Sequence, residues 1–239
     1  MKNSKSDHIV ILTGAGVSAE SGIPTFRGAG GLWEGHDVMD LATPQGFQRQ
    51  PELVQRFYND RRSLLLTKEP NDAHRAIARL QREYPGKVTL ITQNIDDLHE
   101  RGGSTDVWHI HGELLRVRCQ DCGAVLDCRE DIGAASVCAK CNAKGRLRPH
   151  VVWFGEMPLH LDELYALTEN ASIFAAIGTS GQVYPAANFV HVAKERGART
   201  IEFNLESSEV FDEFVPGPAA RTVTEWVDSL IGTKRNSNL

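Results

Sequence analysis

The sequence predicts an α/β fold: a Rossmann-like parallel sheet domain with a small inserted zinc-ribbon domain and a helical insertion. Short apolar runs, of which residues 8–13 are the first, alternate with segments whose apolar residues recur at helical spacing. Two Cys-x-x-Cys pairs lie close together within a polar segment. A simple Rossmann unit reaches its second strand within about thirty residues of its glycine loop. Here the interval is roughly twice as long, which indicates an insertion.

Length and charge limit the classes of protein that the chain can represent. With 239 residues it can form one large domain, or a large domain with a small insert, and bury an apolar core. Its formal net charge of -5 gives nucleic acid no general attraction, so we expect no direct nucleic-acid binding. The apolar run at residues 8–13 leads directly into a glycine loop and fits neither a signal peptide nor a membrane span. We expect a cytoplasmic monomer that does not associate with membranes.

Apolar patterning predicts the elements in order. Two segments, 51–66 and 72–84, have apolar residues at helical spacing, and Asp72 is the expected N-cap of the second. A last helix over 222–232 is expected to end at Gly232. Continuous apolar runs are typical of strands in a sheet that is covered on both faces. Five such runs are residues 8–13, 87–92, 107–110, 172–178 and 199–204.

Composition divides the chain into domains. Residues 115–147 have few large apolar side chains and many Gly, Asp, Lys and Cys, so they cannot form a hydrophobic core of their own. We assign them to the zinc-ribbon module. We expect the Rossmann-like domain to comprise residues 1–27, 88–114 and 148–232. Residues 28–87 are expected to form the cofactor loop and helical insertion, and residues 233–239 a disordered tail.

The cysteine spacing predicts one structural zinc ion. Cys119 and Cys122 form the first pair, and Cys138 and Cys141 form the second after fifteen intervening residues. This spacing matches a four-cysteine zinc ribbon, whose closed tetrahedral ligand set leaves no open position for substrate or water. Four buried free cysteines are the alternative, but the hydrophilic surroundings offer them no core. Cys128 has no assigned role.

A glycine loop follows the first predicted strand and then departs from the dinucleotide-binding pattern. Gly14, Gly16 and Ala19 match the glycine fingerprint. A dehydrogenase would continue with a full helix and an acidic ribose ligand, whereas this chain continues with "GIPTFR". Taken alone, such glycine spacing often marks only a turn. The Gly and Pro content indicates a loop that closes over a bound nucleotide and excludes water.

Seven motifs in order resemble those of the sirtuins, the NAD-dependent protein lysine deacylases, over nearly the whole chain. They are "GAGVSAESGIPTFR" at 14–27, "TQNID" at 92–96, "HG" at 111–112, the cysteine ribbon, "VVWFGE" at 151–156, "GTS" at 178–180 and "FNLE" at 203–206. The resemblance implies that NAD is consumed as a co-substrate: its nicotinamide bond breaks, and the acyl oxygen of a modified lysine attacks the exposed ribose carbon.

The resemblance also implies which residues bind NAD. The 14–16 backbone would hold the pyrophosphate, Ala15, Phe26 and Arg27 would close over the nicotinamide ribose, and Asn94 and Asp96 would lie in the nicotinamide pocket. Asp96 would bond the carboxamide. Without the family, Asn-x-Asp after a strand is more often a turn or N-cap pair. The full set is Gly14, Ala15, Gly16, Phe26, Arg27, Trp33, Gln93, Asn94, Ile95, Asp96, Gly178, Thr179, Ser180, Asn204, Leu205, Glu206 and Ala219.

Three histidines are candidates for acid–base chemistry, and the resemblance selects one of them. The sirtuin pattern places the catalytic histidine directly before the glycine, which implies that His111 is the general base that deprotonates a ribose hydroxyl. An imidazole titrates near neutrality and suits this task. His109 and His99 are expected to be structural.

The resemblance further implies a peptide site and an acyl pocket. Val152, Trp153, Phe154 and Gly155 would pair as a strand with the peptide on each side of the target lysine. Tyr58 and Arg61 lie three apart on one predicted helix and match the Tyr-x-x-Arg pair of sirtuins that remove acidic acyl groups. Ala42 would leave room for the longer acyl chain. Taken alone, such a Tyr and Arg are mostly packing and a solvated charge.

The expected function is therefore NAD-dependent deacylation of acylated-lysine proteins or peptides, with acetyl, succinyl and malonyl groups as substrates. The products would be nicotinamide, deacylated lysine and O-acyl-ADP-ribose. One alternative is a deacetylase in which Tyr58 and Arg61 are only structural. Two more distant alternatives are an NAD-dependent dehydrogenase with a structural zinc, and a zinc-ribbon module that binds nucleic acid or protein without catalysis.

Overall fold

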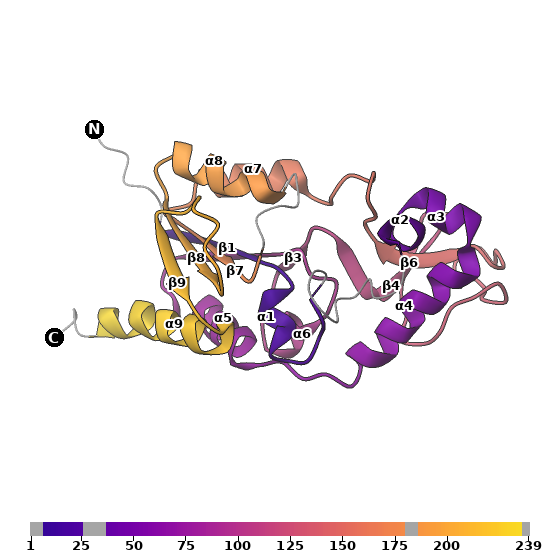
Figure 1. The fold of residues 1–239 in the computed structure, drawn as a ribbon, viewed down its shortest axis with the longest axis horizontal. Helices are drawn as coiled ribbons and strands as arrows, with labels where there is room; N and C mark the ends of the chain where they lie inside the picture. Colours follow the sequence, from indigo (N-terminus) through magenta and orange to yellow (C-terminus); the bar gives the residue numbers. More distant parts are fainter. Residues whose placement is uncertain (1–6, 26–36, 180–185, 236–239) are drawn as a thin grey trace.

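A six-stranded parallel sheet forms the larger part of the molecule (Figure 1). The computed structural model describes residues 7–25, 37–179 and 186–235. The strand order is β3-β2-β1-β7-β8-β9, so the order reverses between β1 and β7. The strands are β1 (His8–Thr13), β2 (Lys87–Thr92), β3 (Val107–His109), β7 (Ile173–Ile177), β8 (Arg199–Asn204) and β9 (Glu213–Pro216).

Helices cover both faces of this sheet, as the continuous apolar runs predicted (Figure 1). Alternate residues of β1 point to opposite faces, so Ile9 and Ile11 pack with α5 and α9, while Val10 and Leu12 pack with α7 and α8. The helices are α5 (Asp72–Glu83), α9 (Ala219–Arg235), α7 (Leu161–Glu169) and α8 (Phe189–Glu195), the last preceded by the short 3-10 helix η1 (Ala186–Asn188). The two faces give the sheet two separate hydrophobic cores.

The helix ends differ in detail from the expected ones. Asn71, not Asp72, is the N-cap of α5, because the Asn71 side chain accepts a hydrogen bond from the Ala73 N–H at 2.9 Å. The last helix begins earlier than expected, at Ala219, and continues past Gly232 to Arg235. Glycine weakens a helix without ending it when the flanking residues remain helical. In the described residues 14–25, the glycine loop is followed by the four-residue helix α1 (Gly16–Ala19) and by no longer helix.

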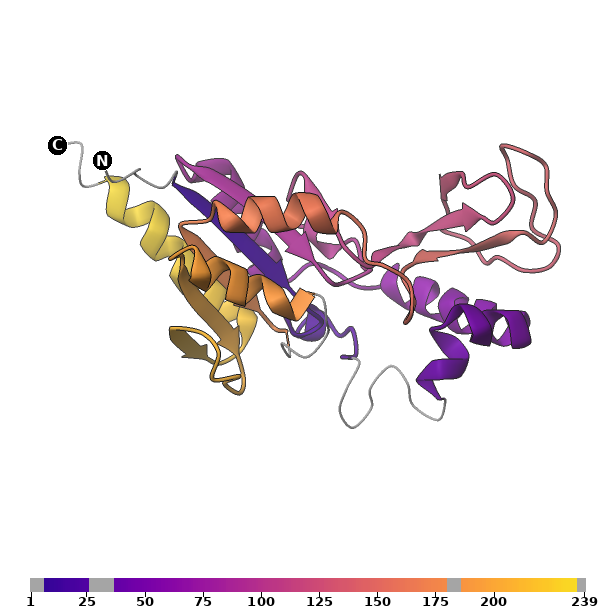
Figure 2. The ribbon, with the colours of Figure 1, turned by 90° about the horizontal axis from the view of Figure 1, so that it is seen from above.

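A second, three-stranded antiparallel sheet lies at the other end of the molecule from β9 and α9 (Figure 2). Its order is β5-β4-β6, with β4 (Gly112–Cys119), β5 (Val125–Asp127) and β6 (Leu147–Val151). Helices α2 (Val38–Leu41), α3 (Pro44–Arg49) and α4 (Pro51–Leu65) pack beside it around a core that includes Leu41, Phe57 and Trp153. The remaining helix, α6 (Leu98–Arg101), follows β2.

This sheet extends slightly beyond the expected zinc-ribbon segment, since β4 starts at Gly112 and β6 ends at Val151. Helix α5, expected in the insertion, packs on the parallel sheet. The division of the chain into domains stays a prediction, and these contacts favour placing α5 with the parallel sheet. Within the described residues, no helix combines the length and the apolar character that crossing a membrane requires.

Candidate active site

The loops after β1, β7 and β8 meet where the strand order reverses, the place where open α/β sheets bind ligands. The Gln93 amide donates to the Thr179 hydroxyl at 2.9 Å, and the Asn204 amide donates to the Thr179 carbonyl at 3.0 Å. Three predicted cofactor residues from distant parts of the sequence are thus joined at one edge. Leu205 is exposed there, and Ala219 is buried at the start of α9.

The glycines of the first loop allow a close approach between two loops. A Cβ at Gly14 would lie 2.8 Å from the Gly178 carbonyl oxygen, and a Cβ at Gly16 would lie 2.6 Å from the Gly178 Cα. The N–H groups of both residues already donate, to the carbonyls of Ile177 and Gly178 at 3.0 and 2.8 Å. These glycines therefore let the β1 and β7 loops approach each other, and the expected binding of a pyrophosphate by the 14–16 backbone stays a prediction.

A small pocket opens beside this edge, and four of the predicted residues, Ala15, Asn94, Ile95 and Asp96, line it. Its wall combines these residues with Ser18, Ile23, Pro24, Arg61, Leu64, Leu65 and Leu114. The polar side chains at its base are bonded to one another: the Asn94 amide donates to the Ser18 hydroxyl at 3.1 Å, and that hydroxyl donates to the Asp96 carboxylate at 3.0 Å. Ser18 was not predicted as a site residue. In the sequence, only its position within the motif at residues 14–27 indicates a role.

Asp96 is an unusual carboxyl group. Only 6% of the residue is exposed, and burial raises its pKa to about 6 against the opposing effect of hydrogen bonds from the Leu98 N–H and Ser18. Asn94 is also buried, and its side-chain oxygen has no partner within the described part of the chain. Acceptor oxygens of Asp96 and Asn94 thus lie at the base of a pocket whose wall is largely apolar.

The environment of His111 leaves one ring nitrogen available. Its Nδ1 lies 2.9 Å from the Gln93 carbonyl oxygen, which can only accept, so Nδ1 carries the hydrogen. In the neutral ring, Nε2 therefore holds the lone pair that a general base needs. Burial lowers the pKa of His111, which keeps the ring neutral near pH 7.

The other two histidines are held differently. His109 contacts the Glu100 carboxylate at 2.7 Å through Nε2 and the Asn94 carbonyl at 3.2 Å through Nδ1. Burial opposes the charged form, but the hydrogen bond and charge of Glu100 outweigh it and raise the pKa of His109. His99 is fully buried and bonds the Thr13 hydroxyl at 3.0 Å. These contacts agree with the expected structural roles.

The predicted acyl pair lies on α4, but only one member lines the pocket. Arg61 does so, with its guanidinium carbon 3.2 Å from the centre of the Phe57 ring. Burial lowers the pKa of Arg61 to about 10, so it is charged at neutral pH. Tyr58 is only 3% exposed, and its oxygen accepts a hydrogen bond from the Trp153 indole at 2.9 Å. Burial raises the pKa of Tyr58 to about 12, so its hydroxyl keeps its proton.

The stretch expected to pair with a peptide is a turn beyond Val151. The N–H groups of Val152, Trp153 and Phe154 already donate to the His111 carbonyl, the Glu156 carboxylate and the Ala42 carbonyl, at 2.9, 2.9 and 2.8 Å. In this conformation these three N–H groups already have partners within the protein, and pairing of this stretch with a peptide stays a prediction. The Trp153 ring packs in the core, whereas Phe154 is 51% exposed. Ala42 is buried and joins α2 to this turn.

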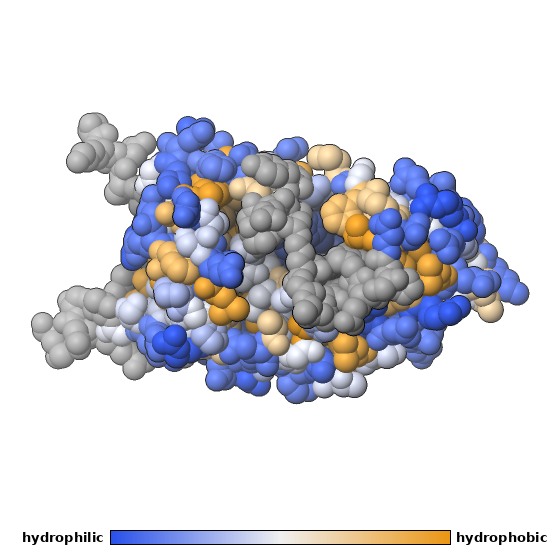
Figure 3. All heavy atoms as spheres, viewed as in Figure 1, coloured by the Kyte–Doolittle hydropathy of each residue, from blue (hydrophilic) through white to orange (hydrophobic). Residues whose placement is uncertain are grey.

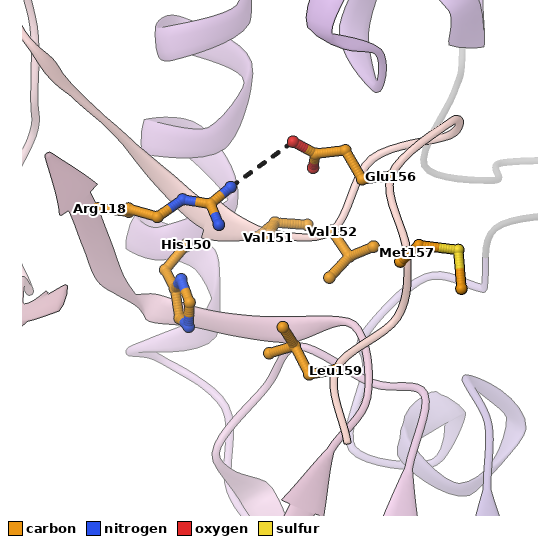
Figure 4. A pocket seen from close by; sticks show the side chains of 7 residues that line it. All are labelled: Arg118, His150, Val151, Val152, Glu156, Met157 and Leu159. Atoms are coloured by element: carbon orange, nitrogen blue, oxygen red, sulfur yellow. Dashed lines mark ion pairs between the residues drawn. The ribbon is translucent and has the colours of Figure 1, made fainter. Parts of the chain in front are cut away.

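A further pocket, lined in part by the predicted peptide-site residue Val152, lies beside the same turn (Figure 4). Arg118 points across it toward Glu156, at 3.5 Å, and Arg148 also pairs with Glu156, at 2.8 Å. The lining is completed by His150, Val151, Val152, Met157 and Leu159. On the face seen in Figure 3, hydrophilic residues dominate the outline, and apolar residues gather near the middle and around α2 to α4.

The four predicted cysteines come together with a geometry that fits zinc. Their sulfur atoms all lie within 4.8 Å of one another. Cys119 and Cys141 are 3.7 Å apart, and Cys122 and Cys138 are 3.8 Å apart, between sulfur atoms. A tetrahedron with Zn–S bonds of about 2.3 Å has S···S edges of about 3.8 Å. Each pair is closed by a tight turn, from the Gly123 N–H to the Cys119 carbonyl and from the Asn142 N–H to the Cys138 carbonyl.

Some predicted residues cannot be placed. Phe26, Arg27, Trp33 and Ser180 lie outside the described residues. The roles of all the predicted site residues stay predictions, since the geometry above shows where they lie and not what binds them.

Comparison with known proteins gives a consistent result. The Sir2 family model matches residues 14–185. The chain is 57% identical to an NAD-dependent protein deacylase of Escherichia coli, over 96% of this chain and 84% of the relative. It is 56% identical to a protein of the same name from Vibrio parahaemolyticus, over 94% and 95% of the two chains.

Solved structures agree in fold along almost the whole chain. A Sir2 homologue mutant in complex with ADP-ribose has a TM-score of 0.90 and 41% identity, over 98% of this chain and 96% of that one. A Sir2 protein bound to an acetylated peptide has a TM-score of 0.78 and 28% identity, over 97% and 94% of the two chains. The sequence motifs, the parallel sheet with its four-cysteine module and these matches lead to one conclusion: the chain belongs to the Sir2 family.

Proposed function

We propose that this chain is an NAD-dependent protein lysine deacylase that converts NAD, water and an acylated lysine into nicotinamide, lysine and O-acyl-ADP-ribose. One observation carries the proposal. His111 follows β3 at this sheet edge, and the Gln93 carbonyl fixes its Nδ1–H, so that Nε2 is the basic nitrogen of the ring. Relatives that are more than half identical are named NAD-dependent protein deacylases, and solved relatives hold ADP-ribose or an acetylated peptide.

The small pocket beside the sheet edge suits nicotinamide. Its base offers the Asp96 carboxylate and the Asn94 side-chain oxygen as acceptors, and a carboxamide NH₂ group supplies two donors. Apolar side chains such as Ile95 and Leu65 complete the wall and suit an aromatic ring. In this assignment, Asp96 and Asn94 hold the leaving group, as the family resemblance implies.

His111 supplies the general base. Its Nε2 accepts the proton of a ribose hydroxyl, while the Nδ1–H bond to the Gln93 carbonyl keeps the ring oriented and stabilises the imidazolium that forms. Because burial lowers the pKa of His111, the ring is ready to accept a proton at neutral pH. The zinc ion has no reacting group to offer here, because four thiolates would fill its coordination shell and its task is to hold the module together.

We further propose that the enzyme removes succinyl and malonyl groups besides acetyl. The Arg61 guanidinium lines the pocket and can bind a carboxylate, and the Tyr58 hydroxyl beside it remains protonated. The alternative, a deacetylase with both residues structural, is favoured by the burial of Tyr58 and by the stacking of Arg61 on Phe57. A monomeric state, a cytoplasmic location and the absence of nucleic-acid binding stay predictions.

A direct assay tests the proposal. The protein is incubated with NAD and matched peptides that carry unmodified, acetyl-, malonyl- or succinyl-lysine, and mass spectrometry follows peptide and nicotinamide. We expect nicotinamide release only with acylated peptides, in equal amount to deacylated lysine and without formation of reduced cofactor. Unchanged peptides and NAD would refute the deacylase proposal. Turnover of acetyl peptides alone would leave the deacetylase and remove the acidic-acyl assignment.

A further inference from the structure

His74 is a buried histidine whose two ring nitrogens are both engaged. It is the third residue of α5, and 0% of it is exposed. The Asn71 backbone N–H donates to Nδ1 at 3.2 Å, and Nε2 lies 3.3 Å from the Ser18 hydroxyl oxygen. A backbone N–H can only donate, so Nδ1 must be the acceptor. The hydrogen of the neutral ring is therefore on Nε2, which donates to Ser18.

This hydrogen bond determines the direction of the Ser18 hydroxyl. The oxygen accepts one hydrogen bond from His74 and a second from the Asn94 amide at 3.1 Å, which occupies both of its lone pairs. Its own hydrogen is then left to donate, and the Asp96 carboxylate lies 3.0 Å away. A chain of hydrogen bonds with one direction thus runs from the first turn of α5 to the pocket.

Asp96 is the last acceptor in this chain of hydrogen bonds. One carboxylate oxygen accepts from Ser18, and the other accepts from the Leu98 N–H at 3.1 Å. Each oxygen keeps a further lone pair, and the residue lines the pocket. If the Ser18 hydroxyl turned away, Asp96 would lose a donor and its buried charge would be less stable.

We infer that His74 is a positioning residue of the leaving-group pocket: its Nε2–H directs the Ser18 hydroxyl toward Asp96 and thereby holds the carboxylate that receives a carboxamide. The inference rests on the proposed function, which assigns this pocket to nicotinamide. His74 touches neither substrate in this account. It acts through Ser18, across the contact between α5 and the loop after β1.

The charged groups around this chain of hydrogen bonds are compatible with the proposed role of His74. Burial, followed by the nearby Arg75, lowers the pKa of His74 to about 4, while Glu100 acts weakly in the other direction. The ring of His99 packs edge-on against it, with centroids 4.8 Å apart. His74 therefore stays neutral above about pH 5. The charged neighbours of Asp96 are His109, which favours its ionised form, and Asp97, which opposes it. Arg61 lines the same pocket.

Two substitutions separate the hydrogen bond from simple packing. His74→Phe keeps a ring of similar size and removes the donor. His74→Gln restores both functions, because a glutamine at the third helical position can accept from the N-cap N–H and donate through its amide. His8→Phe is the matched control, since His8 is also buried, at 3% exposed, but bonds Thr89 away from the pocket. Circular dichroism and melting temperature show whether each variant folds.

The readouts are exchange of labelled nicotinamide into NAD with an acetylated peptide present, the KM of that peptide, and the pH profile of kcat/KM for NAD. For His74→Phe we expect exchange to need about tenfold more nicotinamide, the value of one lost hydrogen bond. The peptide KM should not change. The acid limb of the profile should move to higher pH, because Asp96 loses a donor and its pKa rises. His74→Gln should restore exchange to within about threefold, a fraction of one hydrogen bond.

Several outcomes would overturn the inference. Normal exchange and an unmoved acid limb in His74→Phe would do so, as would an equal loss in His8→Phe. If His74→Phe does not fold, Ser18→Ala takes its place and should show the same loss with an unchanged peptide KM. Asp96→Asn should lose exchange altogether. Normal exchange in Asp96→Asn would instead refute the nicotinamide pocket of the proposed function, a result distinct from failure of the His74 inference.

Discussion

The two ends of the pocket are built in different ways. At the sheet edge, Ser18, Asn94 and Asp96 are fixed by hydrogen bonds to one another and to His74. On the α4 side, behind the residues that line the pocket, aromatic rings pack together, with centroids 5.2 Å apart for Phe47 and Trp153 and 6.3 Å apart for Tyr58 and Trp153. Directional bonds hold groups in one geometry, whereas apolar packing tolerates changes of shape. This difference agrees with the proposal that bond breaking occurs at the sheet edge and that α4 determines the choice of acyl group.

The largest expected effect comes from removing the base at the sheet edge. His111→Ala should lower kcat by about a thousandfold, because general-base catalysis contributes factors of this size. NAD binding, measured by calorimetry, should remain close to that of the unaltered protein. His109→Gln serves as the comparison, since both nitrogens of His109 are engaged by the protein. Turnover that survives in His111→Ala would mean that another residue is the base.

The zinc module supports the α4 end, and its removal is the second test. Arg148, in β6 of the module, stacks over the Trp153 ring at 3.4 Å and pairs with Glu156. These contacts link the α4 end to β6. Chelation of zinc, or Cys138→Ser, should unfold this small sheet and abolish deacylation, since four thiolates lose the ion that joins them. Circular dichroism and zinc analysis provide the measurement. A zinc-free protein that remains folded and fully active would contradict the structural role.

The α4 end can be tested without changing the residues at the sheet edge. Arg61→Met should lower kcat/KM for succinyl peptides by up to about a hundredfold, the value of a charge-assisted hydrogen bond of about 1.5–3 kcal/mol. Deacetylation should change by about threefold at most, since an acetyl group offers no carboxylate. Arg56→Met, at an exposed position of the same helix, is the matched control. Equal losses on succinyl and acetyl peptides would remove the acidic-acyl assignment.

The smallest expected effect concerns pH and the buried carboxylate of the edge. The folded protein raises the pKa of Asp96 from 3.8 to about 6, so it binds more protons than the unfolded chain between these values. The contribution of Asp96 to the free energy of unfolding is at most about 3 kcal/mol. It is fully present below about pH 4 and is lost as the pH rises through about 6. Urea unfolding from pH 4 to 7 should therefore show a flatter dependence for Asp96→Asn. Parallel curves for both proteins would count against the shifted pKa.

Much of the scaffold could be predicted because local pattern determines it. The five expected strands are β1, β2, β3, β7 and β8, each a continuous apolar run. β9, α7 and α8 were not predicted. In β9, half-buried and exposed residues alternate over only four positions at the sheet edge. The N-cap of α5 was misplaced by one residue, since Asn71 and Asp72 are both good caps and only the hydrogen bond to Ala73 distinguishes them.

Part of the site was beyond sequence reasoning. Ser18 and His74 lie 56 positions apart, and their contact exists only because α5 packs beside the loop after β1. The close packing at Gly14 and Gly16 was not predicted for a similar reason. Their constraint is the approach of the β7 loop, which no local pattern reveals.

The sequence by itself determined the chemical inventory: the zinc ligands through their spacing, the sheet through its apolar runs, and the candidate base through the motif at residues 111–112. Only the tertiary structure decided which nitrogen of His111 carries the hydrogen and which carboxyl group is buried. The physical reason is that protonation, hydrogen-bond direction and burial depend on partners from distant segments. For His111 that partner is the Gln93 carbonyl, and for Asp96 it is Ser18.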